Sequence, residues 1–181
     1  MHCLRRQGSL RKAYPVPMKG SGAVYISLSR LAGMPVIWQD RQMGYVEHAL
    51  VDAGLCCLDG VVVRKGIGAA KWVGCGAIAL VGSRCVLINA KPERMPVRGQ
   101  DRPGQVFLTT GQSAGEVTDV FIQCDTFRVA ALEVCQGPLY RLMGQRAYAP
   151  QFCVQPNGQV MVQDLLSWAQ LVKQLGEEEE G

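Results

Sequence analysis

The chain has 181 residues, 48% of them hydrophobic and 19% charged, a composition that supplies a core and excludes a globally disordered protein. This length suits one medium-sized domain or two small ones. The net charge of +4 is modest, and its distribution along the chain is more informative than its sum. No apolar run approaches the roughly 18 residues that a membrane-spanning helix requires. We therefore expect a soluble, cytoplasmic protein that does not span a membrane.

Residues 1–25 are predicted to be a flexible basic extension. They mix Arg, Lys, Pro and Gly without periodicity, and the first 19 residues contain no acid. Basic tails of this kind can reach nucleic acid or an anionic membrane. A competing interpretation places the true start at Met18 and gives the preceding residues no role. The N-terminal mass of the native protein distinguishes the two.

Residues 26–90 are predicted to form a first small β-barrel. The stretch SLSRLAG suits one helical turn, and Pro35 then opens the strand PVIW. A polar turn ends at Gly44, as in a hairpin or bulge. Next come the strands Tyr45–Val51 and CLDGVVVRK, the loop GIGAA, and a final segment with a strand, a tight corner and a closing strand. Short Val- and Ile-rich strands at this spacing are typical of small barrels.

Residues 104–163 are predicted to form a second barrel that repeats the first, after a Pro-rich linker at 91–103. A shift of 71 residues places Gly44 on Gly115, and it aligns the apolar strand that follows each glycine. Each copy then contains five or six short strands in the same order. One such copy buries only a modest core, so a second barrel packed against it would stabilise both.

A C-terminal helix is predicted over residues 164–176, followed by an acidic tail at 177–181. Asp164 is a suitable N-cap, and apolar residues recur at helical spacing from Leu165 through Trp168 to Leu175. Two interpretations of this apolar stripe remain. It packs on its own barrel, or it docks on another protein or on a second copy of the chain.

Both copies resemble the PRC-barrel family. In the first copy the resemblance lies in LAGMPVIWQDRQMGYVEHALVD followed by LDGVVV. In the second it lies in GQVFLTTGQSAGEVTDVFIQCDTFRVAALEV, where Asp125 and Thr126 lead into an R-V strand. The segment DAGLCCLDG of the first copy departs from the usual strand entry, and the second copy has a longer middle loop. The fold class that this resemblance implies is all-β, with two tandem PRC-type barrels and a C-terminal helix.

The resemblance implies a protein that binds rather than catalyses. PRC barrels occur in the photosynthetic reaction-centre H subunit, in a ribosome-maturation factor, and in small proteins of sporulating Gram-positive bacteria, which the start ISLSRLAGMPVI resembles most. The resemblance therefore implies a non-enzymatic adaptor that mediates protein–protein interaction or assembly in the bacterial cytoplasm. A ribosome- or RNA-associated maturation factor is the alternative.

The residues themselves give little sign of chemistry. The eight cysteines form no C-x-x-C, and there are only two histidines, so no zinc-finger spacing exists. His48 aligns with Asp119 and has no evident catalytic partner. We therefore expect no catalytic residue, metal or cofactor. The adjacent Cys56 and Cys57 leave a weaker hypothesis of a thiol-based sensor.

Binding residues are expected in or next to the two corresponding middle loops and on the C-terminal helix. An aromatic side chain on a loop is a reasonable interface anchor, and nearby basic residues would also suit RNA. The predicted interface comprises Trp72, Tyr140, Arg141, Arg146 and Trp168. The partner is expected to be an unidentified protein, with RNA or the ribosome as the alternative. The sequence leaves open whether the chain forms a homo-oligomer.

Overall fold

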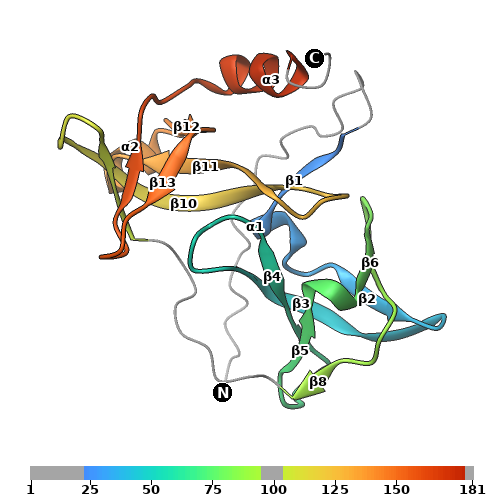
Figure 1. Ribbon diagram of the computed structural model, residues 1–181. Helices are drawn as coiled ribbons and strands as arrows, with labels where there is room; N and C mark the ends of the chain where they lie inside the picture. Colours follow the sequence, from blue (N-terminus) through green and yellow to red (C-terminus); the bar gives the residue numbers. More distant parts are fainter. Residues whose placement is uncertain (1–22, 95–103, 178–181) are drawn as a thin grey trace.

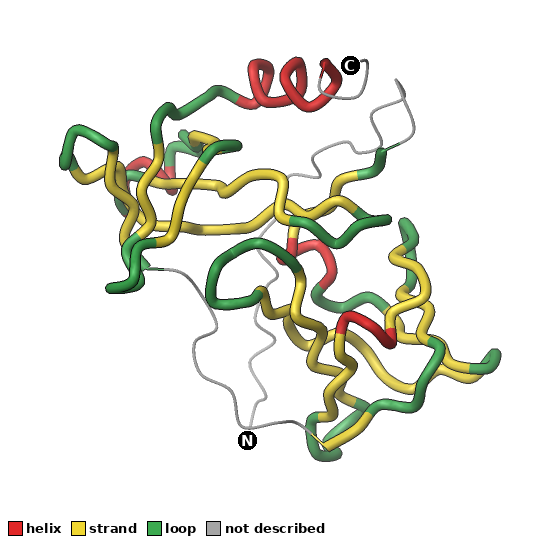
Figure 2. Tube along the Cα trace, in the orientation of Figure 1, coloured by secondary structure: helices red, strands yellow, loops and turns green. Residues whose placement is uncertain are grey.

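The computed structural model describes residues 23–94 and 104–177. Most of the predicted basic extension, the alternative start at Met18, most of the predicted linker and nearly all of the acidic tail lie outside these residues. The described part is mostly β-structure, arranged as two curled sheets with a helix beside one of them (Figures 1 and 2). The mostly β architecture and the C-terminal helix are therefore confirmed.

The first sheet has the strand order β6-β7-β2-β3-β4-β5-β8. Its strands are β2 (Pro35–Trp38), β3 (Arg41–Val51), β4 (Leu58–Arg64), β5 (Lys71–Gly74), β6 (Ile78–Val81), β7 (Val86–Ile88) and β8 (Glu93–Arg94). A 3₁₀ turn, η1 (Cys75–Ala77), forms the expected corner between β5 and β6. β8 falls inside the predicted linker and extends the sheet by pairing with β5.

The second sheet has the order β12-β11-β10-β9-β14-β13. Its strands are β9 (Gln105–Leu108), β10 (Ser113–Gln123), β11 (Val129–Cys135), β12 (Ala147–Ala149), β13 (Phe152–Val154) and β14 (Val160–Val162). The helices are α1 (Leu28–Leu31), α2 (Pro138–Leu142) and α3 (Trp168–Glu177). The six strands repeat the order β6-β7-β2-β3-β4-β5 of the first sheet. Two curled sheets of equal topology do not identify a family, so the PRC-type assignment stays a prediction.

Individual residues of the first repeat have the same backbone conformation and contacts as their equivalents in the second. Gly44 has φ +149° and Gly115 has φ +123°, and a Cβ on either would collide with a carbonyl oxygen of the neighbouring strand. These carbonyls belong to Arg64 and Cys135, which are also 71 residues apart. Both conditions exclude ordinary side chains, which explains why each copy has glycine there. The irregular steps in strand pairing in β3 recur in β10 at the same offset.

The two sheets meet around an internal two-fold axis. Cys57 forms an antiparallel bridge with Arg128, the residue 71 positions later. The Leu58 N–H donates to Phe127 O at 2.8 Å, and the Val129 N–H donates to Cys56 O at 3.0 Å. Exchanging each residue for its repeat partner turns one bond into the other. A segment that contacts its own equivalent marks the axis of a two-fold interface.

A short strand breaks this symmetry. β1 (Tyr25–Ser27) precedes the first sheet in the chain but pairs antiparallel with β10 of the second. Residues of both sheets form one continuous hydrophobic cluster, in which Ile26 of β1 is 5% exposed. The two sheets thus share a core, and this burial stabilises them together.

Helix α3 covers the outer face of the second sheet. Leu171 and Leu175 pack there against Phe121, Ala131 and Tyr148. The helix begins at Trp168, so the predicted start at Asp164 and its role as the N-cap are wrong. Ser167 Oγ accepts from the Gln170 N–H at 3.4 Å, and Gln170 Oε1 accepts from the Ser167 N–H at 2.8 Å. This reciprocal pair is a capping box, which satisfies two backbone donors at the helix start.

Candidate binding surfaces

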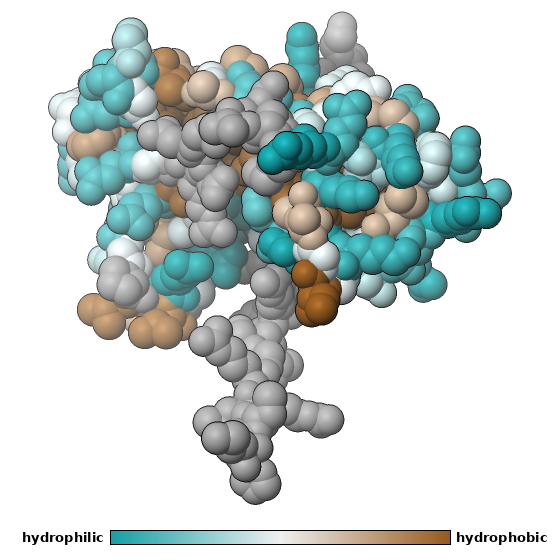
Figure 3. Space-filling model, turned by 90° about the horizontal axis from the view of Figure 1, so that it is seen from below, coloured by the Kyte–Doolittle hydropathy of each residue, from teal (hydrophilic) through white to brown (hydrophobic). Residues whose placement is uncertain are grey.

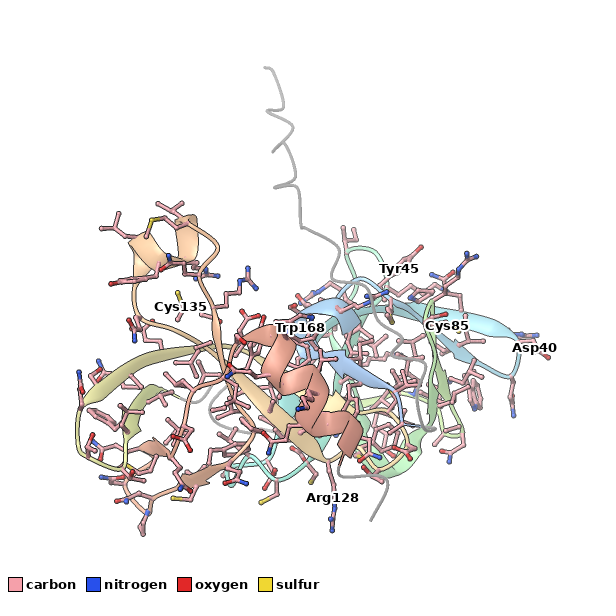
Figure 4. The ribbon with its side chains drawn as sticks, turned by 90° about the horizontal axis from the view of Figure 1, so that it is seen from above. Asp40, Tyr45, Cys85, Arg128, Cys135 and Trp168 are labelled. Atoms are coloured by element: carbon pink, nitrogen blue, oxygen red, sulfur yellow. The ribbon has the colours of Figure 1, made fainter. Side chains whose placement is uncertain are left out.

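The structure places two of the predicted interface residues in packed clusters. Trp72 lies on β5, next to the predicted loop, and is 8% exposed, so little of its side chain is available to a partner. Its ring lies against Gly60, where a Cβ would collide with it. Trp168 is half-buried and its ring centroid lies 5.6 Å from that of Phe121. Figure 4 looks down on α3, with Trp168 labelled at its first turn.

Arg146 is held by a buried carboxylate. Its Nη1 lies 2.8 Å from Oε1 and 2.9 Å from Oε2 of Glu133, whose residue is only 3% exposed. Thr118 Oγ1 also donates to Glu133 Oε1, at 2.7 Å. This ion pair fixes the foot of the loop between β11 and β12. The arrangement makes Arg146 a structural residue of that loop.

Tyr140 and Arg141 are exposed on α2, where they stand beside apolar residues that the sequence analysis missed. The exposed fractions are 70% for Leu139, 43% for Tyr140, 84% for Leu142 and 64% for Met143. We call residues 139–143 the α2 tip. The available signal was the segment PLYRLMG, an apolar cluster inside a loop that shows no strand periodicity.

A second exposed apolar side chain lies in the corresponding hairpin of the first sheet. Ile67 is completely exposed in the turn of residues 65–68, where the Gly68 N–H donates to Lys65 O at 3.1 Å. Arg64 holds this turn, since its Nη1 donates to Gly68 O at 3.1 Å and its Nε donates to Glu47 Oε2 at 2.9 Å. We call residues 65–68 the β4–β5 tip. Figure 3 shows apolar groups projecting at two separate places along one edge of the face viewed.

A groove of about 420 Å³ lies at the junction of the two sheets. Its walls come from β1 and the end of β6, and the turn after β10 closes it. The lining residues are Val24, Tyr25, Ile26, Arg30, Leu80, Val81, Gly82, Ser83, Cys124 and Asp125. Leu80 is 52% exposed and Val24 is 44% exposed, so apolar surface is open to water there. We call this the β1–β6 groove.

The strand β6, which borders the groove, has an edge without a described partner. This strand ends the first sheet and pairs only with β7 among the described strands. Unpaired strand edges present rows of N–H and C=O groups that bind another extended chain. The groove therefore combines apolar walls with backbone groups that suit a β-strand.

The cysteines give little support to the thiol-sensor hypothesis. Burial, followed by the carboxylate of Asp52, raises the pKa of the Cys57 thiol. Burial also raises the pKa of Cys75, and it raises the pKa of Cys124 to about 11. The thiolate is the reactive form, so these shifts reduce reactivity near neutral pH. No group of three or more potential metal ligands occurs in residues 23–94 and 104–177.

The sequence matches no protein-family model and no curated protein. Within the described ranges, no helix is both long enough and apolar enough to cross a membrane.

Proposed function

We propose that the chain is a non-enzymatic adaptor of the bacterial cytoplasm that binds another protein in the β1–β6 groove. The observation that supports this proposal is the groove itself. Its walls expose Val24 and Leu80 to water, and the bordering strand β6 pairs only with β7 among the described strands, which leaves one edge of β6 for another chain. An extended peptide with apolar side chains at alternate positions matches both features. Its backbone would bond to a strand edge while every second side chain entered the groove.

The position of the groove supports an assembly role. It is built from both halves of the chain, because Leu80 belongs to the first sheet and Cys124 follows a strand of the second. A peptide bound there would contact both sheets at once. Binding energy would therefore add to the shared core in holding the sheets together.

Capture from native extract with a matched pair of variants tests the proposal. Leu80→Arg places a charge in the groove, and Tyr45→Arg places the same charge elsewhere on the first sheet. Both side chains are 52% exposed, so both variants should fold. We expect a protein that the parent and Tyr45→Arg capture and that Leu80→Arg loses.

The capture is repeated after nuclease treatment and at several salt concentrations. Capture of ribosomal proteins or rRNA that nuclease abolishes, with a steep loss between low and moderate salt, would favour the RNA-associated function. Equal capture by both variants would overturn the groove as the protein-binding site.

A further inference from the structure

The α2 tip and the β4–β5 tip are equivalent parts of the two repeats. Each is the hairpin that follows the strand β4 or β11, whose ends Arg64 and Cys135 are 71 residues apart. Both lie on the same side of the molecule (Figure 4). There α2, drawn in orange, extends beyond the labelled Cys135, and the turn after β4 lies beyond the labelled Tyr45. The internal two-fold axis explains this placement, because equivalent points lie at equal height along such an axis.

Both tips are shaped before anything binds. In the α2 tip the Met143 N–H donates to Leu139 O at 3.0 Å, and the Gln145 N–H donates to Tyr140 O at 2.9 Å. An arginine–glutamate ion pair braces each hairpin, Arg146–Glu133 in one and Arg64–Glu47 in the other. Preformed tips bind without a further ordering cost.

The side chains at the tips combine apolar and cationic groups. Leu139, Leu142 and Met143 are at least 64% exposed on one tip, and Ile67 is completely exposed on the other. Lys65 and Arg141 stand exposed among them. Isolated exposed apolar residues are ordinary, but two such tips on one side of a molecule mark an interaction surface.

We propose that the two tips insert together into the surface of an anionic lipid membrane. The α2 tip and the β4–β5 tip lie at equal height along the internal two-fold axis, so a flat surface perpendicular to that axis can contact both. A lipid bilayer is such a surface. The apolar side chains would enter the boundary between headgroups and acyl chains, and Tyr140 suits the polar interface. Lys65 and Arg141 would meet the negative headgroups, each adding roughly a fivefold gain in affinity. This site lies apart from the β1–β6 groove, so the adaptor could hold a protein at a membrane.

Flotation of the full chain with lipid vesicles tests the proposal. The vesicles contain either phosphatidylcholine alone or a mixture with one third phosphatidylglycerol. We expect binding to the anionic vesicles that exceeds binding to the neutral ones and weakens with salt. Leu142→Glu removes one apolar group that would enter the membrane and adds repulsion from the anionic headgroups, so its binding should fall at least about tenfold. Ile67→Glu should also reduce binding, and the double variant should abolish it.

Leu80→Glu is the matched control, since it makes the same change at an exposed leucine that lies in the groove. It should bind vesicles as the parent does. Parent binding that Leu142→Glu and Ile67→Glu leave unchanged would overturn the proposal, as would an absence of binding to anionic vesicles. Loss of a captured protein in Leu142→Glu, without any vesicle binding, would show that the tips contact protein instead. None of these results depends on the groove variants Leu80→Arg and Tyr45→Arg.

Discussion

Breaking the Glu133–Arg146 pair should destabilise the fold strongly, whereas replacing both partners should not. Glu133 is 3% exposed, and Arg146 supplies the cation that it contacts. Removing only the arginine leaves a buried carboxylate with Thr118 as its remaining side-chain donor. Such losses cost about 3–5 kcal/mol. The Arg146 side chain is 33% exposed, so water can reach the site, and we expect about 3 kcal/mol for Arg146→Leu.

The other repeat shows that an apolar side chain fits at the position of Glu133. Val62 lies 71 residues earlier, is 1% exposed, and packs against Leu50 and Trp72. The double variant Glu133→Val with Arg146→Leu removes both charges, and it gives position 133 the valine that the first repeat has there. Replacement of a buried ion pair by packed apolar groups is often neutral or stabilising. We therefore expect the double variant to lie within about 1 kcal/mol of the parent.

Urea unfolding of the parent, the two single variants and the double variant measures the coupling between Glu133 and Arg146. The comparison requires that the dependence of the unfolding free energy on urea concentration be the same for all four proteins. The cycle should give a coupling energy of about 2–3 kcal/mol. An Arg146→Leu variant within about 0.5 kcal/mol of the parent would show that solvent satisfies the carboxylate. A double variant as unstable as Arg146→Leu would show that packing, rather than the unpaired charge, sets the cost.

Three further predictions concern the backbone, a thiol and a helix cap. Gly115→Ala should lower the free energy of unfolding by at least about 2 kcal/mol, because the new Cβ would meet the Cys135 carbonyl at a positive φ. The control Gly76→Ala should cost about 1 kcal/mol or less, since Gly76 has open space around it and no positive φ. Equal urea midpoints for the two variants would contradict this prediction. Burial raises the Cys124 pKa from 9.0 to about 11, so alkylation followed by mass mapping should find Cys124 modified far more slowly than the exposed Cys153 at pH 8. The same shift stabilises the fold fully below pH 9, and this contribution should disappear as the pH rises through about 11. Ser167→Ala should cost about 1 kcal/mol by removing the cap of α3, and an unchanged urea midpoint would refute that role.

The duplicated sheets could be predicted because their requirements are local. Gly44 and Gly115 each sit where positive φ and a close carbonyl exclude a side chain, so the repeat is visible in sequence. The pairing of β1 with β10 is different. Three residues, Tyr25–Ser27, carry no information about which distant strand they meet, and only the arrangement of both sheets decides it.

The candidate binding residues were harder to predict because exposure depends on the neighbouring layers. Trp72 follows an apparent loop in sequence, yet β5 extends to include it, and its ring packs across Gly60. Leucine usually lies in a protein core, and the sequence around Leu139 and Leu142 does not show that their loop projects away from the sheet. Their exposure became evident only once α2 was placed at the end of a hairpin.

A single substitution between the repeats explains why only the second sheet needs a helix. Gly60 of the first sheet leaves room for the Trp72 ring to lie on the strand, and Leu50, Val62 and Trp72 close that small cluster. The residue 71 positions later is Ala131, whose methyl group occupies this space, and the strand beside it carries Tyr148 instead. Leu171 and Leu175 of α3 then cover this part of the outer face. The helix thus replaces in the second repeat the cover that one tryptophan supplies in the first.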